Sequence, residues 1–268
     1  WGEPGATEPE AWLDGSSLDL SAVKASSVRV FARWKVGTCE GAEATSWVVT
    51  LAEGFPPPAG QEGSDAVAKD DARIVGWATQ VSAVSFGANV DASWQHPERA
   101  LGAAEGVTTA VVPLGEGGSI TLGFDAPIAD GPGPELAIFE NGFSEDFLEL
   151  GRVSVSSDGE HFARFAVGSG TAAAVGPYAR LDATQVGGFA GRYRVGYGTP
   201  FDWALLVDEP EVRSGEVDLS AIVAVRLEDV VGDGREQDDF GHVVYDPYPS
   251  TQTAGFDLDA VAVLRSAP

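Results

Sequence analysis

Two carboxylates stand inside an apolar strand in the terminal sequence GFDLDAVAVL. Because side chains alternate across a strand, Asp257 and Asp259 are predicted to share one face, which continues as Val261 and Val263. Two like charges that leave water together are costly unless a cation compensates them. Arg265 is the only basic residue close by in sequence. The pattern therefore favours a bound hard cation, with calcium (Ca2+) as the first choice.

Further oxygen ligands are predicted upstream of this strand. Glu140 ends the apolar row LAIFE and falls, by alternation, on the face of Leu136 and Ile138. Calcium takes about six to eight oxygens from carboxylates, amides and backbone carbonyls, so acidic strand ends and loops are suitable sources. The alternative is that these carboxylates accept backbone N–H bonds or pair with arginine. The candidate ligands are Asp130, Glu140, Asn141, Asp246, Asp257 and Asp259.

The sequence gives little indication of a catalytic site. The three histidines, His96, His161 and His242, are far apart in sequence, and none has metal-ligand spacing to another. Any two of the 41 acidic residues could be paired as glycosidase carboxylates, so such a pairing carries no information. No nucleophile elbow, phosphate loop or dinucleotide fingerprint is present. We expect a protein that is not an enzyme, with a glycan-active enzyme as the least favoured alternative.

Composition limits the class of partner. A formal net charge of −25, from 41 acidic and 16 basic residues, argues against nucleic acid, which is bound by surfaces rich in Lys and Arg. No apolar run approaches the roughly 18 residues of a membrane span, so we expect none. The charge fits a secreted or cell-surface protein, and it would also simply keep an abundant extracellular protein in solution.

Three single residues add expectations. Cys39 is the only cysteine, which excludes an intrachain disulfide and a thiolate metal cluster; it is a half-buried turn residue, an intermolecular bridge or a nucleophile. The chain begins at Trp1 and contains no Met, which suggests a processed or trimmed product. Trp94 lies in a predicted loop and is the candidate exposed contact for a surface glycan or a protein, with core packing as the alternative.

Most of the remaining sequence has the residue pattern of short β-strands, and no long amphipathic helix is predicted. The sequence SSDG, ending at Gly159, places Asp-Gly at the turn of a predicted hairpin. Many short strands separated by Gly and Pro predict an all-β fold, a β-sandwich or jelly roll. The predicted strands cover residues 28–36, 46–51, 74–86, 108–114, 119–124, 136–140, 153–156, 161–167, 203–207, 222–231 and 260–264.

The least regular stretch, residues 53–71, contains three consecutive prolines and is predicted to be a linker or long loop. It divides the chain into an N-terminal arm and strand pair, residues 1–71, and a jelly-roll β-sandwich domain, residues 72–268. Two strands are too few for a stable domain, so the arm is expected to pack on the main domain or on a neighbouring subunit.

Seven ordered motifs after Ala72 carry a resemblance to a family of bacterial secreted and cell-surface β-sandwich proteins. The hairpin that ends at Gly159 is similar to one in discoidin-like, galactose-binding-like jelly rolls. The resemblance implies an exported jelly roll with a structural calcium and loops that bind glycans or other surfaces. It does not extend over residues 1–71. The motifs are WATQVSAVSF, PERALG, GSITLGF, DGPGPELAIFENGF, GYGTPFD, DPYP and GFDLDAV.

Two functions are consistent with these observations. The first is a non-catalytic extracellular or cell-surface module, stabilised by calcium, that acts in binding or in surface structure. The second is a self-assembling subunit of an extracellular filament or sheath. In that case the N-terminal segment would add a strand to the open sheet edge of a neighbour.

Overall fold

The structure is a computed structural model that describes residues 27–32, 35–36, 39–40, 45–50 and 54–265. The chain divides into two compact units, Trp1–Gly54 and Phe55–Pro268. The side chains of residues 1–53, including that of Cys39, lie outside the described set.

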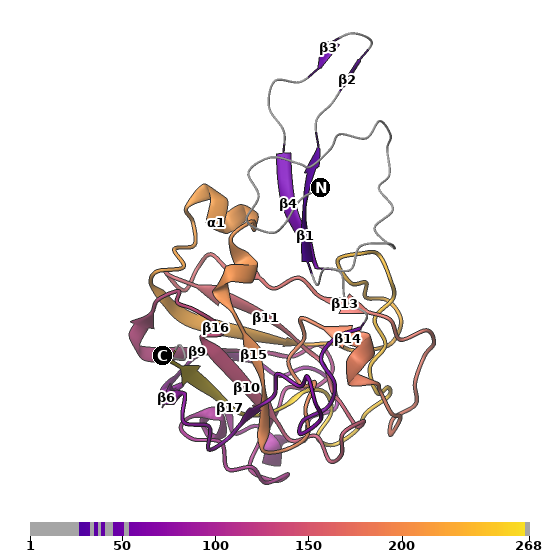
Figure 1. The fold of residues 1–268 in the computed structure, drawn as a ribbon. Coiled ribbons are helices and arrows are strands. Elements are labelled where there is room, and N and C mark those ends of the chain that lie inside the picture. Colours follow the sequence, from indigo (N-terminus) through magenta and orange to yellow (C-terminus); the bar gives the residue numbers. More distant parts are fainter. Residues whose placement is uncertain (1–26, 33–34, 37–38, 41–44, 51–53, 266–268) are drawn as a thin grey trace. The chain divides into compact units, whose positions relative to one another are not determined.

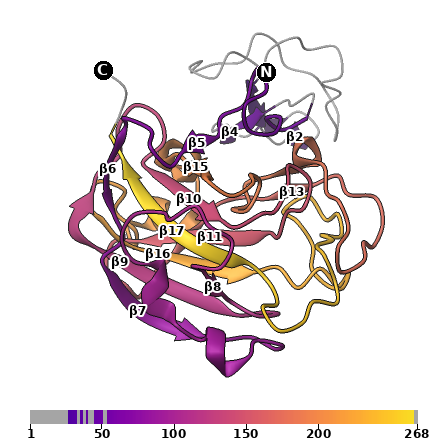
Figure 2. The same ribbon diagram turned by 90° about the horizontal axis from the view of Figure 1, so that it is seen from below.

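The larger unit is an all-β sandwich of two antiparallel sheets, which Figures 1 and 2 show as two layers. The first sheet has the order β5 (Val67–Ala68), β15 (Tyr197–Phe201), β10 (Leu136–Glu140), β17 (Asp257–Leu264) and β6 (Ile74–Trp77), with β8 (Val112–Pro113) also paired to β17. The second has the order β12 (Ala163–Arg164), β11 (Gly151–Ser156), β16 (Ile222–Asp229), β9 (Ser119–Ile128) and β7 (Gln80–Ser85). Most neighbours are not consecutive in sequence, as in jelly rolls, and the predicted fold class is confirmed.

One hydrophobic core joins the facing sides of the two sheets. Ile138 and Val261 of the first sheet belong to the same buried cluster as Leu122, Val153 and Val225 of the second. In β9, β10 and β11 the members of this cluster occupy alternate positions, as the period of two requires. The burial of this shared face holds the two layers together.

The outer face of the first sheet is buried as well. Ala137 and Phe139 of β10 and Ala260 and Ala262 of β17 form a second cluster, which Val67 of β5 completes. Because β10 is buried on both faces along its whole length, its sequence LAIFE reads as a continuous apolar run. Any carboxylate at the end of such a strand therefore lies in a water-poor environment.

The predicted Asp-Gly hairpin is confirmed. Ser154 pairs with Arg164 and Val155 with Ala163 across the turn between β11 and β12. Gly159 adopts the positive φ of 82° that such a turn needs.

Several strand predictions were wrong in detail, and of residues 108–114, for example, only Val112–Pro113 form a strand. The segment predicted as a strand at residues 203–207 contains a 3-10 helix, η4 (Trp203–Leu206), because the Asp202 carboxylate accepts a hydrogen bond from the Ala204 N–H and starts a helical turn. The strand β15 directly before it was missed, since its sequence YGTPF contains Gly and Pro. The remaining short elements are η1 (Ala92–Trp94), η2 (Pro97–Ala100), β13 (Gly168–Ser169), η3 (Ala183–Gln185), β14 (Val186–Gly187) and α1 (Pro210–Ser214).

The smaller unit contains two pairs of antiparallel strands. The strands β1 (Ser27–Ala32) and β4 (Thr45–Thr50) form one two-stranded sheet, and β2 (Lys35–Val36) and β3 (Cys39–Glu40) form the other. The predicted strand pair is therefore present in the first of these sheets.

The units divide at Gly54 and Phe55, earlier than the boundary predicted at residue 71. Residues 55–71 belong to the sandwich: β5 adds an edge strand beside β15, and the Phe55 N–H donates to the Thr184 carbonyl. Across the described residues, none of the helices has the length and apolar character needed to cross a membrane.

Candidate metal centre

The terminal strand carries a β-bulge at its two carboxylates. Phe139 of β10 pairs with Ala260, but the next residue, Glu140, pairs with Leu258, so the register skips Asp259. Leu258 consequently lies in the same core cluster as Val261. The prediction that the face of Asp257 and Asp259 continues as Val261 and Val263 is therefore wrong, because the bulge reverses the alternation between them.

Three candidate ligands meet where β10 ends and β17 begins. The Asn141 side-chain amide donates from Nδ2 to Asp257 Oδ2 at 2.9 Å and to the Thr108 carbonyl at 3.0 Å. Glu140 Oε2 accepts the Gly142 N–H at 2.8 Å. One oxygen remains on each side chain, namely Glu140 Oε1, Asn141 Oδ1 and Asp257 Oδ1, and each is buried without a hydrogen-bond partner among the described residues. Buried oxygens of this kind are costly unless they meet a donor or a cation.

Burial makes these carboxylates resist ionisation. Desolvation, together with the nearby charge of Asp257, raises the pKa of Glu140 well above its usual value. Desolvation likewise raises the pKa of Asp257 to about 8, opposed by the hydrogen bond from Asn141. Glu149 also has a strongly raised pKa, because it is buried beside Asp257, Glu140 and further acids. Within the described residues no Lys or Arg side chain forms an ion pair with any of them.

Asp246 and Asp229 extend the cluster toward the second sheet. Asp246 Oδ1 accepts the Leu150 N–H at 2.9 Å, and burial next to Asp229 raises its pKa well above the usual value. Asp229 accepts the N–H groups of Gly117 and Phe256 at 2.9 and 2.7 Å. Its pKa is raised to about 7 by desolvation, against the effect of these two bonds. We call Glu140, Asn141, Glu149, Asp229, Asp246 and Asp257 the buried acidic cluster.

Glu149 and Asp229 were missed by sequence reasoning, although the signal was present. Glu149 lies between the buried side chains of Leu148 and Leu150, and Asp229 ends the apolar strand β16. Both repeat the pattern that identified Glu140, a carboxylate embedded in an apolar row.

Asp259 is satisfied by the backbone. Its two carboxylate oxygens accept the N–H groups of Glu105 and Gly106 at 3.0 and 2.9 Å. Desolvation raises its pKa, and these bonds and the charge of Lys69 oppose the rise. For this residue the alternative predicted from sequence, backbone N–H bonds in place of a metal, describes the structure.

Asp130 lies in a different group, which forms near the opposite end of β10. Carboxylate oxygens of Asp130, Glu135 and Asp202 all come within 4.8 Å of one another, so this group could hold a metal ion. Glu135 is buried, and its two oxygens accept the N–H groups of Gly131 and Trp203 at 2.9 and 2.8 Å. Desolvation raises its pKa to about 7, with the charges of Asp202 and Asp130 as smaller contributions. Asp130 is exposed and is not part of the buried acidic cluster.

Trp94 ends η1 and is half-buried. The guanidinium carbon of Arg99 lies 5.8 Å from the centre of its ring, a cation–π contact. The ring is therefore partly covered by its own chain.

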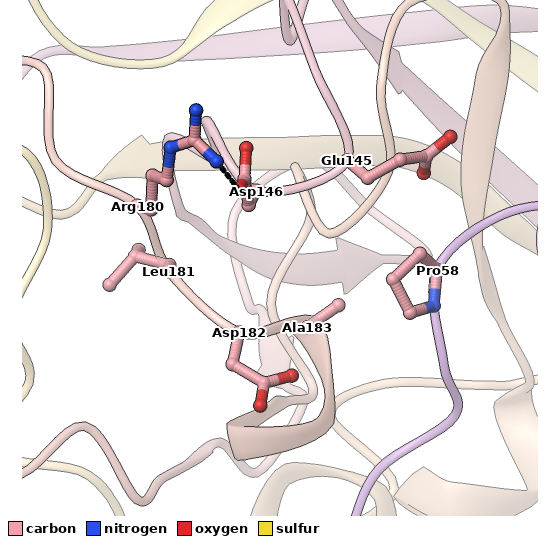
Figure 3. A pocket seen from close by; sticks show the side chains of 7 residues that line it. All are labelled: Pro58, Glu145, Asp146, Arg180, Leu181, Asp182 and Ala183. Atoms are coloured by element: carbon pink, nitrogen blue, oxygen red, sulfur yellow. Dashed lines mark hydrogen bonds and ion pairs between the residues drawn. The ribbon is translucent and has the colours of Figure 1, made fainter.

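A pocket elsewhere on the sandwich is lined by three acidic side chains and one arginine, and of the three carboxylates only that of Asp146 points toward Arg180 (Figure 3). Arg180 Nη1 lies 2.9 Å from Asp146 Oδ2, and the Glu145 carboxylate pairs with Arg194. The lining residues are Pro58, Glu145, Asp146, Arg180, Leu181, Asp182 and Ala183.

Comparison of the chain with family models, with curated proteins and with solved structures found no match. Arguments about function therefore depend on the geometry described above.

Proposed function

We propose that this chain is a non-catalytic, extracellular or cell-surface β-sandwich module stabilised by calcium at Glu140, Asn141 and Asp257. The observation that carries the proposal is the set of three buried oxygens without partners at one end of the first sheet. Two belong to carboxylates and one to an amide, which are the ligand types of calcium.

A divalent cation resolves an electrostatic conflict that the protein side chains leave open. An ionised carboxylate that is buried without a positive partner costs several kcal/mol, so it either takes up a proton or binds a cation. The raised pKa values of Glu140 and Asp257 mean that, without a metal, these carboxylates take up protons. At neutral pH the carboxylates would instead bind a cation. Calcium is the better candidate, because it tolerates irregular coordination, whereas magnesium demands a nearly ideal octahedron.

The geometry of the histidines gives little support to catalysis. Each ring nitrogen that forms a hydrogen bond does so with a nearby acid in the chain: His96 with Glu98, His161 with Asp158, and His242 with Asp238. The rings are separated in sequence and partly or largely exposed. A binding or surface-structural role, through loops or sheet edges, is the more economical interpretation, with a surface glycan or a protein as the partner class.

The test combines metal analysis with thermal unfolding. Purified protein dialysed against trace calcium is expected to retain calcium in elemental analysis, and chelation is expected to lower Tm by several degrees. Re-addition of calcium should restore Tm more completely than the same concentration of magnesium. The variant Asp257→Asn should lose most of the calcium response.

The matched control is Asp125→Asn, which changes an exposed carboxylate on β9. It should retain the full response to calcium. Absence of metal, together with a Tm that does not respond to chelation at pH 8, would refute the proposal.

A second candidate function is self-assembly through the N-terminal unit. It is favoured by the pairing of β1 with β4 alone within the described residues, which forms a sheet of two strands. Isolated two-stranded sheets are marginally stable in water, and their open edges can pair with another chain. A neighbouring subunit would supply the missing partner.

A further inference from the structure

We infer that the open edge of β7 (Gln80–Ser85) pairs with the same strand of a second copy of this chain, so that the second sheet continues across a two-fold axis. The inference goes beyond both proposed functions and depends neither on calcium nor on the N-terminal unit. It is based on an outer strand of the sandwich that lacks most of the features by which proteins protect such strands from pairing.

The backbone of β7 is open on one side. The strand lies at the end of the second sheet and pairs only with β9, beside which it borders the sandwich in Figure 2. Within the described residues, the backbone of β7 forms no hydrogen bond to other backbone groups outside this ladder. Five of its six residues are exposed, so no other segment covers the edge. Its outward N–H and carbonyl groups can therefore pair with another strand.

The sequence of β7 does not oppose such pairing. Proteins commonly protect outer strands by making them very short or by placing charged side chains or Pro on them. The outer strands β5 and β12 are two residues long, whereas β7 has six residues. The sequence QVSAVS contains no charge and no Pro, and no charged residue occurs anywhere in residues 74–90. This edge is therefore long, neutral and exposed.

The missing charge favours a second copy as the partner. Two chains with a net charge of −25 repel each other wherever their acidic surfaces meet. Residues 74–90 include the outer strands β6 and β7, where two chains can approach without adding carboxylates of this stretch to the contact. Pairing of identical edges about a two-fold axis also closes both edges at once, which gives a dimer rather than an open chain.

A bulge in β7 aligns its two valines. Val81 pairs with Leu122 and, beyond a register shift between Val81 and Ala83, Val84 pairs with Ile120. Leu122 and Ile120 both belong to the core that joins the two sheets. Val81 and Val84 therefore lie on the core-facing side of the sheet although they are three positions apart, which a regular strand would not allow.

This alignment makes a symmetric register possible. A two-fold axis brings the same faces of the two copies together, so paired residues must lie on one face. Antiparallel pairing can then place Val81 opposite Val84 of the second copy, and Gln80 opposite Ser85. Val84, which is 37% exposed in the single chain, would be covered by an apolar neighbour.

The experiment measures self-association of the full-length chain by sedimentation velocity over a range of protein concentrations. A dimer that forms with rising concentration is expected. Its dissociation constant should fall as NaCl rises from about 0.05 M to about 0.5 M, because salt screens the repulsion between two acidic chains. A dimer that weakens with salt would be held by charged pairs and would contradict the assignment.

Val84→Lys places a charge on the paired edge. It should raise the dissociation constant about tenfold, since the change occurs twice in a symmetric dimer. The matched control is Val207→Lys, which puts the same charge at an exposed valine outside both sheets and should leave the dissociation constant unchanged. Circular dichroism confirms that each variant is folded. Amide hydrogen exchange of the wild type should show protection of residues 80–85 that increases with protein concentration.

The remaining outcomes separate this inference from the proposed functions. A wild-type chain that stays monomeric at all concentrations overturns the inference and leaves the calcium proposal standing. A dimer without added protection at residues 80–85 also overturns it, and assigns association to another surface, such as that of the N-terminal unit. Equal dissociation constants for the two Lys variants would refute it as well. Exchange in the wild type decides the question even if Val84→Lys fails to fold.

Discussion

The pH dependence of stability offers the sharpest test of the buried acidic cluster. In the metal-free protein the pKa of Asp257 is about 8 and that of Asp229 about 7, whereas an aspartate in an unfolded chain titrates near pH 3.9. Between about pH 4 and pH 8 the folded protein therefore retains protons that the unfolded chain has lost. Stability falls with rising pH wherever the folded state binds more protons. The metal-free protein should accordingly be less stable at pH 8 than at pH 5.

The magnitude follows from the size of the shift. For Asp229, which is 5% exposed, a rise of about three pKa units corresponds to a loss of on the order of 4 kcal/mol across its titration range, as an upper bound. At Asp257, whose pKa is raised to about 8, the proposed calcium ion would replace the proton and remove the corresponding penalty. At about 100 times its Kd, one bound ion adds about 2.7 kcal/mol. For a domain of this size that free energy corresponds to a rise in Tm of about 5–11 °C.

The assay is thermal unfolding of metal-stripped protein in metal-free buffers from pH 5 to pH 8, with and without calcium. Chelators are avoided because their own affinity for calcium changes with pH. The Tm of the stripped protein should fall as pH rises, and the gain in Tm from calcium should be larger at pH 8 than at pH 5. Asp257→Asn should show a weaker dependence on pH, which separates the cluster from general repulsion at a net charge of −25. A stripped protein whose Tm rises from pH 5 to pH 8 would refute the reasoning.

Two further predictions concern the turns and the N-terminal unit. Gly159 and Gly188 both have positive φ, but a Cβ at Gly159 would meet nothing within 4 Å, whereas one at Gly188 would lie 2.0 Å from the Ala166 carbonyl oxygen. Gly159→Ala should therefore cost about 1–2 kcal/mol of unfolding free energy in urea, and Gly188→Ala clearly more; equal costs would contradict the predicted clash. If β1 and β4 mediate assembly, deletion of residues 1–54, which removes both strands, should abolish polymers in negative-stain images while the sandwich stays folded. A wild-type chain that remains monomeric in calcium would dispose of the assembly hypothesis.

Much of the sandwich was predictable because its strands are marked by local patterns. The strand β10 was predicted with its observed bounds, since an apolar run buried on both faces is unmistakable in sequence. The Asp-Gly turn identified its hairpin for a similar reason. Trp203 was assigned to a strand because its apolar neighbours favour one, but the capping carboxylate of Asp202 decided the local conformation.

The candidate site was only partly predictable, because it depends on pairing between distant strands. Sequence gives the spacing of Asp257 and Asp259, but the bulge that separates their environments is a property of the register with β10. Asp257 consequently retains an unpartnered oxygen, while Asp259 is satisfied by two backbone donors. Similarly, the separation of Asp130 from the other candidates follows from the length of β10, which puts the two groups near opposite ends of the strand.

The hydrogen bond between Asn141 and Asp257 joins residues that are 116 positions apart in the chain. A cation seated there could not be captured by a short stretch of polypeptide emerging on its own, because one of its three proposed ligands, Asp257, arrives only with the last strand. Uptake of the ion would then be a late event in folding, coupled to closure of the whole domain. A chain that crosses a membrane unfolded would consequently carry no ion with it, and would acquire its calcium from the medium in which it finishes folding.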